Sequence, residues 1–319
     1  MLLKVFFFSL ILVATSAVRA ELKVVTTIKP LHSLIANVMD GVGEPALLIE
    51  GSTSPHSFTL KPSHAKLLEE ADIIFWVGES IETFMERPLE SIVKNAEVVE
   101  FMEVESINKL KFREVSIFED HDEHDDHDEH DDNDDHDEHD DHSGHDDHGH
   151  GHGEFDAHIW LDPMNAKEMV HEIAHELGNL DLANKNKYEA NAQATIQALD
   201  QLVNDIEKGI NKDAKFVVFH DAYQYFEERF ETRAAGALTL NTDVLPGAKQ
   251  IADIQDVIKD RGIKCIFSEQ QFNPKIITTI AEDMNIKTGV FDPLGTNIDS
   301  NKDLYFKLIQ NLGNELKGC

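Results

Sequence analysis

The sequence is poor in cysteine and in basic residues, and each shortage excludes a class of protein. Two cysteines in 319 residues rule out a small domain held together by several disulfides. The 28 basic residues face 61 acidic ones, a formal charge of −33. Nucleic-acid binding is therefore disfavoured, as is binding to an anionic membrane surface, because both need a basic footprint. The sequence also has no nucleophile elbow, glycine-rich phosphate loop or paired catalytic carboxylates.

The first twenty residues have the pattern of a secretory signal peptide. Lys4 precedes an apolar run from Val5 to Val13, and small residues lead up to Ala20. A retained membrane anchor is the weaker alternative, because a span needs about 20 apolar residues. No cysteine for lipid attachment follows the cleavage point. We therefore expect a soluble exported product, and a bacterial periplasm fits it.

Export would place the two cysteines, Cys265 and Cys319, outside the reducing cytoplasm. In an oxidising compartment an even count favours pairing, so we expect one disulfide between them. It would close a loop of about 55 residues and contribute roughly 4 kcal/mol on the chain-entropy model. The alternative is a buried Cys265 with a free thiol at Cys319.

Short β-rich runs alternate with helical patterns along both halves of the chain, which predicts parallel sheets in two α/β domains. Between the halves, residues 166–210 have helical periodicity that breaks near Gly178 to Asp181. The second helix there is long and polar enough to connect two domains. We therefore expect an N-terminal domain over 21–186, a connecting helix over 187–210 and a C-terminal domain over 211–319.

An acidic, histidine-rich block occupies residues 119–154. It holds 19 acidic side chains and 11 of the 18 histidines, has no Lys or Arg, and repeats histidine at every third position over much of its length. Without apolar residues it cannot offset the entropy of ordering, so we expect disorder in the absence of metal. Acidity alone explains solubility but not the regular histidines. The composition therefore predicts a tract that binds several metal ions weakly.

Three other histidines stand where a metal site could form. His56 lies in the loop STSPHSF, His158 in DAHIWLDP, and His220 ends the run KFVVFH. Ligands of open α/β sheets bind beyond the carboxyl ends of strands, which suits His56 and His220. Three imidazoles leave a fourth zinc position for water or a carboxylate, and Asp292 in GVFDPLG also follows a strand. Spacing alone does not bring these residues together.

A competing zinc motif occurs in HEIAHELGNLD, residues 171–181. In a zinc protease, His171 and His175 would hold the metal on one helical face and Glu172 would act as base. The same helix carries an apolar stripe opposite the two histidines, which indicates ordinary packing. We prefer an incidental surface pair, with a secreted metalloprotease as the alternative. The stripe consists of Ala166, Met169, Val170, Ile173, Leu177 and Leu180.

The order of several motifs resembles the ZnuA-type periplasmic zinc-binding proteins, in the metal-receptor cluster of the solute-binding proteins of ABC transporters. The resemblance covers nearly the whole chain after residue 20, including the histidine-rich insertion and the two cysteines. The segments that carry it are SPHSFTLKPSHAKLLEEADIIFWVG, HIWLDPMNAKEMV, FVVFHDAYQYF, GIKCIFSEQQFNP and FDPLGTNI.

This resemblance implies that His56, His158 and His220 bind zinc in a cleft between two α/β domains joined by a long helix. Manganese-binding relatives have a carboxylate in place of His220, and an imidazole there favours zinc. Some zinc-binding members place a glutamate just before the first histidine, where this chain has Pro55. The fourth ligand is therefore either Asp292 or water, and the resemblance does not decide between them.

The resemblance further implies a non-enzymatic monomer that delivers zinc to an ABC permease in the inner membrane. A periplasmic metal buffer that never meets a permease is the other alternative. Because a rigid connecting helix limits hinge closure, we expect zinc release through local loop rearrangement.

Overall fold

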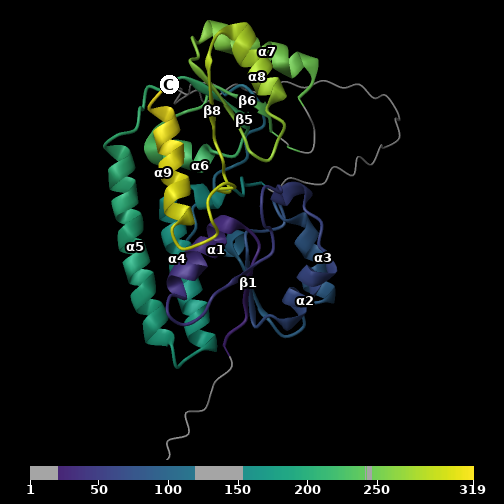
Figure 1. Ribbon diagram of the computed structural model, residues 1–319, viewed down its shortest axis with the longest axis vertical. Helices are drawn as coiled ribbons and strands as arrows, with labels where there is room; N and C mark the ends of the chain where they lie inside the picture. The colour runs from purple at the N-terminus through teal and green to yellow at the C-terminus, as the bar shows by residue number, and fades with distance from the viewer. Residues whose placement is uncertain (1–20, 119–153, 241, 243–245) are drawn as a thin grey trace, which may run out of the picture.

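The computed structural model describes residues 21–118, 154–240, 242 and 246–319, which form two lobes (Figure 1). The predicted signal peptide, 1–20, and nearly all of the histidine-rich block lie outside the described residues. Among the described helices, none has the length and apolarity needed to cross a membrane.

The first lobe is built on a four-stranded parallel sheet with the order β2-β1-β3-β4. Its central strands are short and apolar, and both faces are buried, as in parallel sheets covered by helices. The strands are β1 (Val24–Thr26), β2 (Ala46–Leu47), β3 (Ile73–Trp76) and β4 (Glu97–Glu100). The helices between them are α1 (Lys29–Val38), α2 (Pro62–Glu70) and α3 (Glu86–Ser91).

The second lobe repeats this topology with the order β6-β5-β7-β8. The chain runs from β5 to β6 on one side and then crosses back to β7 on the other. This reversal leaves a crevice beyond the carboxyl ends of β5 and β7, where open α/β sheets bind ligands. The strands are β5 (Phe216–His220), β6 (Ala237–Thr239), β7 (Cys265–Ser268) and β8 (Lys287–Val290). The helices are α6 (Gln224–Phe230), α7 (Ala248–Asp260) and α8 (Lys275–Met284).

The two lobes are connected by the helix pair α4 (Pro163–Leu180) and α5 (Lys185–Glu207). Helix α4 begins at a favourable cap, because Asp162 accepts a hydrogen bond from the backbone N–H of Met164 and proline holds the first position. Helix α5 returns alongside α4 and also contacts α1 and α9 (Leu304–Leu316). The long connecting helix expected from the sequence is confirmed, and the break before it falls at residues 181–184.

One apolar core runs through both lobes, and hydrogen bonds fasten it across their junction. The indole N–H of Trp160 donates to the carbonyl of Pro293 at 2.8 Å, and the Tyr305 hydroxyl donates to the carbonyl of Trp160 at 2.7 Å. All three residues are buried. This shared core opposes a wide hinge motion between the lobes.

The stretch before the histidine-rich block crosses to the second lobe. Ile117 pairs with Gly236, and Ala237 donates to the carbonyl of Ser116 at 2.8 Å, next to β6. Lys111 pairs with Phe155 on the other side of the block. Both chain ends that flank the block are therefore fixed to the folded protein.

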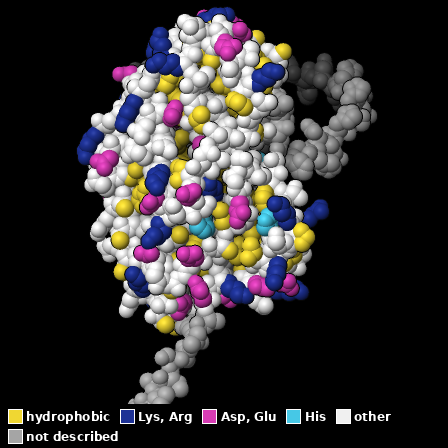
Figure 2. Space-filling view, in the orientation of Figure 1, with side chains coloured by type: hydrophobic (Ala, Val, Ile, Leu, Met, Phe, Trp, Pro, Cys, Tyr) yellow, Lys and Arg dark blue, Asp and Glu magenta, His cyan; other side chains and the backbone are white. Residues whose placement is uncertain are grey.

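The predicted disulfide is present. Cys265, at the start of β7, is bonded to Cys319, with 5.6 Å between their Cα atoms. On the face shown in Figure 2, basic and acidic side chains are interspersed with apolar ones. The acidic side chains of the described residues therefore do not form a single patch on this face.

Candidate metal centre

Three histidines from distant parts of the sequence meet between the lobes. His56 lies in a 3₁₀ turn (Pro55–Ser57) after β2, where the Ser54 hydroxyl accepts a hydrogen bond from the His56 backbone N–H at 3.3 Å. His158 directly precedes a second 3₁₀ turn (Ile159–Leu161), and His220 is the last residue of β5. Each imidazole is thus carried by a short, ordered element or by the residue directly before one.

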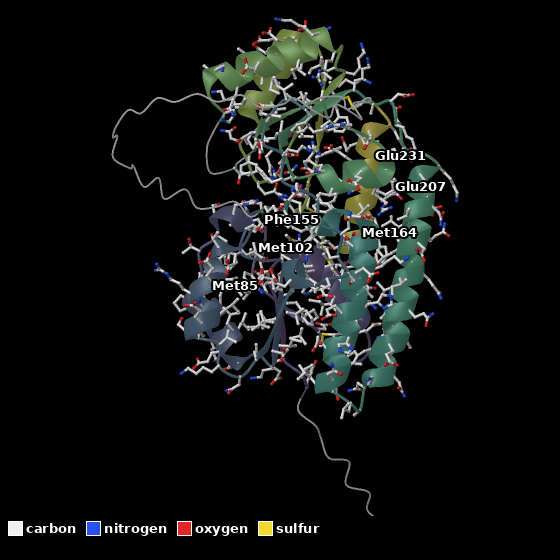
Figure 3. The ribbon with its side chains drawn as sticks, turned by 180° about the vertical axis from the view of Figure 1, so that it is seen from behind. Met85, Met102, Phe155, Met164, Glu207 and Glu231 are labelled. Carbon is white, nitrogen blue, oxygen red and sulfur yellow. A yellow bond between two sulfur atoms is a disulfide. The ribbon has the colours of Figure 1, made fainter. Side chains whose placement is uncertain are left out.

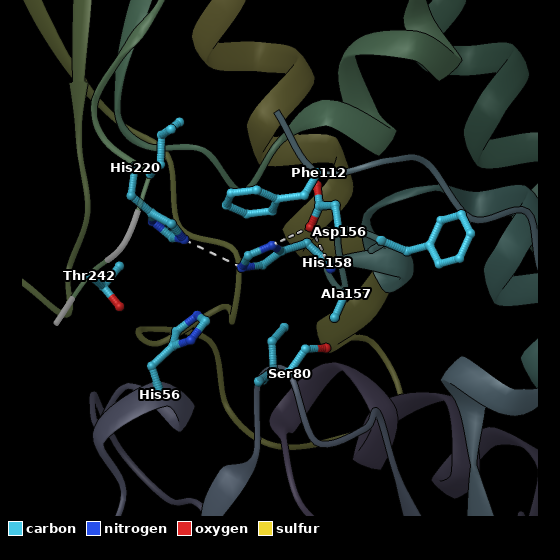
Figure 4. A pocket seen from close by; sticks show the side chains of 11 residues that line it. His56, Ser80, Phe112, Asp156, Ala157, His158, His220 and Thr242 are labelled. Carbon is cyan, nitrogen blue, oxygen red and sulfur yellow. Dashed lines mark hydrogen bonds and ion pairs between the residues drawn. The ribbon is translucent and has the colours of Figure 1, made fainter. Parts of the chain in front are cut away.

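The imidazoles converge on a common point, as Figure 4 shows. One nitrogen from each ring lies within 4.8 Å of the others. The ring centroids of His56 lie 5.7 Å from His158 and 6.0 Å from His220. His158 and His220 are about 5% and 4% exposed, and His56 is half-buried. This arrangement can hold one metal ion through three neutral nitrogens.

The cavity beside the three imidazoles has a volume of about 30 Å³. Since a cavity holds one water molecule at roughly 10–15 Å³, this one has room for an ion with a water, but not for an organic substrate. Its wall includes Phe155, and also Ser80, Phe112 and Thr242, which are labelled in Figure 4. Phe155 directly follows the histidine-rich block and pairs with Lys111, the neighbour of Phe112. This end of the block is therefore attached beside the histidine cavity.

Two buried carboxylates orient two of the imidazoles. Glu269, just after β7, accepts a hydrogen bond from Nδ1 of His220 at 2.6 Å. Asp156 accepts from Nδ1 of His158 at 2.7 Å and from its backbone N–H at 2.9 Å. Carboxylates in this position fix the tautomer of a metal-binding histidine and make its other nitrogen a stronger donor. Both rings are therefore preset to present Nε2 to the cavity.

The charge of these carboxylates also affects the protonation of His220. Burial alone would lower its pKa, but the negative charge and hydrogen bond of Glu269, helped by Asp221 and Asp156, raise the pKa above the ordinary 6.5. His220 is consequently a stronger base than a free imidazole, which suits a metal ligand.

Asp292, the candidate fourth ligand, lies outside this cluster and has other partners. Its Oδ1 accepts from Nε2 of Gln271 at 3.0 Å and from the N–H of Leu294 at 3.1 Å, and its Oδ2 accepts from the N–H of Thr296 at 2.5 Å. Among the described residues, three ligating atoms come together only at His56, His158 and His220.

The histidines of the HEIAH motif are exposed on α4, away from this cavity. His171 and His175 border a groove of about 550 Å³ between α4 and α5, with Glu189 and Asp200 on its far side. From behind, Met164 at the start of α4 and Glu207 at the end of α5 lie towards the same end of the helix pair, as an antiparallel arrangement requires (Figure 3). The opposite face of α4 is buried, as the apolar stripe predicts.

Sequence reasoning missed Asp156, Glu269 and Gln271. A signal for Glu269 was available, because it follows the strand IKCIFS, and the neighbouring parallel strand ends at His220. Asp156 stands two residues before His158. Gln271 had no signal in the sequence, since its role depends on a hydrogen bond to a residue 21 positions away.

Two parallel-sheet lobes around a small, histidine-lined cavity define a two-lobed α/β binding protein. Comparison with known proteins identifies the family within this class. The model of the family described as "ZnuA: Zinc-uptake complex component A periplasmic" matches residues 24–319. The chain belongs to the ZnuA family.

Individual relatives agree with this assignment. A Brucella abortus protein named "High-affinity zinc uptake system protein ZnuA" is 47% identical over 303 residues, covering 93% of this chain and 91% of its own. A Yersinia pestis protein of the same name is 32% identical and covers 98% of this chain and 95% of its own.

Solved structures show the same fold at lower identity. A crystal structure of ZnuA superposes with a TM-score of 0.72 at 20% identity, covering 93% of this chain and 99% of the other. The laminin-binding protein of Streptococcus agalactiae gives 0.70 at 23% identity, covering 93% and 100%. These likenesses support the two-lobed α/β architecture.

Proposed function

We propose that this protein is a periplasmic receptor that captures Zn²⁺ and delivers it to an ABC permease of the inner membrane. The observation that carries the proposal is the convergence of three imidazoles on a buried cavity sized for one ion. The relatives named as high-affinity zinc uptake proteins supply the metal and the transport role.

The ligands in this proposal are His56, His158 and His220, with water or Asp292 in the fourth position. Neutral imidazole suits zinc, which is commonly four-coordinate in proteins, whereas manganese prefers oxygen ligands in six-coordination. Asp156 and Glu269 support the proposed ligands from behind by accepting their Nδ1 hydrogens. The donor set therefore favours zinc over harder cations.

The protein acts as a carrier in this proposal, without a catalytic step. It works as a monomer with domains over 21–186 and 211–319 and the connecting helix over 187–210. The shared core and the Trp160–Pro293 hydrogen bond support zinc release through loop rearrangement rather than wide domain opening. The block at 119–154 collects zinc weakly near the cavity.

The proposal is tested by zinc calorimetry of the chain 21–319 without residues 119–154. We expect one tight site, lost when His56, His158 and His220 are changed to alanine. The matched control is His171→Ala/His175→Ala, which removes two histidines from α4 and should leave the tight site intact. A tight site that survives the triple change but not the control change would overturn the proposal in favour of the HEIAH helix.

A second experiment addresses the protease alternative. Glu172→Ala should leave zinc affinity unchanged. Neither the wild-type protein nor this variant should have peptidase activity. Hydrolysis by the wild-type protein that disappears in this variant would instead identify a metalloprotease.

Delivery to a permease is tested by growth. A strain lacking the protein should grow poorly under zinc limitation and recover when zinc is added or when the intact gene is restored. The triple histidine variant should fail to restore growth. Normal growth of the deletion strain under zinc limitation would favour a buffer over an uptake receptor.

A further inference from the structure

Gln271 stands between the histidine cavity and Asp292. Its side chain lines a second, smaller space of about 10 Å³ on another side of the three imidazoles. His56, His158, His220, Phe272 and Leu294 also border this space. Its amide Nε2 donates to Asp292 Oδ1 and to the Thr296 hydroxyl, each at 3.0 Å. Gln271 thus contacts the candidate fourth ligand from the side of the metal cavity.

The hydrogen bond to Asp292 fixes the orientation of the Gln271 side-chain amide. An ionised carboxylate can only accept hydrogen bonds, so the NH₂ group of Gln271 has to face Asp292. The carbonyl oxygen Oε1 then points the other way. Within the described part of the chain it is buried and has no hydrogen-bond partner. Among the described residues, Gln271 therefore has an unpartnered, neutral carbonyl oxygen and borders the space that the three histidines also line.

The carboxylate of Asp292 is saturated by its own loop and by Gln271. Backbone N–H groups of Leu294 and Thr296 and the Thr296 hydroxyl all donate to it. These donors come from the residues just after it in sequence. Gln271 is the partner that reaches it from the β7 side.

The backbone of this loop is itself clamped from the first lobe. The ammonium group of Lys29, which is buried at the start of α1, donates to three carbonyls of the loop, those of Gly295, Thr296 and Ile298, at 2.9, 2.9 and 2.6 Å. Because the backbone is held, Asp292 can approach the metal only by rotating its side chain. That rotation breaks the hydrogen bond to Gln271 as well as those to Leu294 and Thr296, and Gln271 is the one of these donors that lies outside the loop.

We propose that Gln271 determines metal preference by holding Asp292 out of the coordination sphere. This inference rests on the proposed function, since it assumes that the three histidines bind the ion. With Asp292 held back, the ion meets three imidazoles and a neutral position, which suits zinc. An added charged oxygen would make the site more favourable for Mn²⁺. Gln271 acts here as a positioning residue.

The test compares Zn²⁺ and Mn²⁺ affinities by chelator competition in the chain 21–319, with residues 119–154 retained in every variant. Gln271→Ala should raise Mn²⁺ affinity relative to Zn²⁺ by about tenfold, the lower end of the effects seen when residues behind a metal site are changed. Gln271→Ala/Asp292→Ala should lose this gain. Gln271→Leu, which retains the side-chain bulk without the donor, is the second variant in case the alanine variant does not fold.

A spectroscopic readout separates coordination from a general loss of structure. With Co²⁺ in the site, Gln271→Ala should change the visible absorption band, because an added carboxylate oxygen alters the coordination geometry. The conservative change Gln271→Asn should restore part of the wild-type spectrum. The matched control is Gln201→Ala, which removes a similar amide-to-carboxylate hydrogen bond, to Asp205 at 2.8 Å, on exposed α5.

A relative Mn²⁺ affinity within about twofold of wild type in both Gln271→Ala and Gln271→Leu would overturn the inference. So would a gain that persists in the double variant, because Asp292 would then not be its source. Failure of the proposed function looks different, since the wild-type protein would then have no tight zinc site that depends on the three histidines.

Discussion

The Nε2 atoms of His158 and His220 face each other at 3.3 Å. Each ring also has Nδ1 against a carboxylate, Asp156 or Glu269, which can only accept a hydrogen bond. Both Nδ1 atoms therefore carry hydrogens, and two neutral rings would point lone pairs at each other. A proton on one ring, or a cation shared by both, relieves this repulsion. Zinc binding is consequently a competition between metal and proton.

The first prediction concerns the pH dependence of zinc affinity. Because the pKa of His220 is raised, protons compete with zinc at a higher pH than they would for a free imidazole. Affinity should therefore be highest in mildly alkaline solution and should already decline as pH falls towards 6.5. Chelator competition between pH 8.5 and 5.5 measures this. An affinity that is constant over that range would contradict the histidine site.

The second prediction concerns the carboxylates behind the ligands. Glu269→Gln and Asp156→Asn should each weaken zinc binding by about 10- to 100-fold, because the histidines lose a charged acceptor. Glu269→Gln should also shift the pH profile to lower pH, since Glu269 is the main cause that raises the pKa of His220. Calorimetry at several pH values gives both quantities. Glu189→Gln, on α5, is the matched control. An equal loss of zinc affinity in this control would show that the loss does not come from the carboxylates behind the histidines.

The third prediction concerns the disulfide. Cys265→Ala/Cys319→Ala should lower the free energy of unfolding by roughly 4 kcal/mol, because the unfolded chain is no longer constrained. The bond joins the start of β7 to the chain end, so zinc affinity should stay near the wild-type value. Denaturant unfolding of the metal-free protein and zinc calorimetry test the two parts. A large loss of zinc affinity in folded protein would show that the bond also shapes the site.

The fourth prediction concerns Glu82, which is fully buried and lies two residues after Ser80. Burial raises its pKa from 4.5 to about 7, although backbone N–H groups of Val77 and Gly78 donate to it. The unfolded state therefore loses this proton at lower pH than the folded state. Stability should fall as pH rises from about 4.5 through 7, and Glu82→Gln should remove that fall.

The size of this effect follows from the shift in pKa. At pH 8 the glutamine variant should be more stable than wild type by on the order of 3 kcal/mol, and near pH 4 the two should be similar. Denaturant unfolding at both pH values measures the difference. Glu90→Gln on exposed α3 serves as the control. A variant that is less stable than wild type at pH 8 would mean that the ionised carboxylate is stabilising.

Much of the fold could be predicted from local patterns. The alternation of apolar runs and helical periodicity indicated two parallel sheets. It also indicated two helices in residues 166–210, and the break between α4 and α5 falls at 181–184, at the end of the stretch expected from the sequence. The apolar stripe opposite His171 and His175 indicated that this helix packs in the core. These features depend on residues close in sequence, whose periodicity records which face is buried.

The sequence by itself indicated the candidate histidines, because His56 and His220 stand at the carboxyl ends of predicted strands and His158 lies in a segment that carries the family resemblance. Only the tertiary structure decided which groups stand behind them. Glu269 reaches His220 because β5 and β7 are parallel neighbours in register, and Gln271 reaches Asp292 because both residues follow strands of one sheet. Such contacts are set by strand order and register, which join residues far apart in the chain and leave no periodic trace in the sequence.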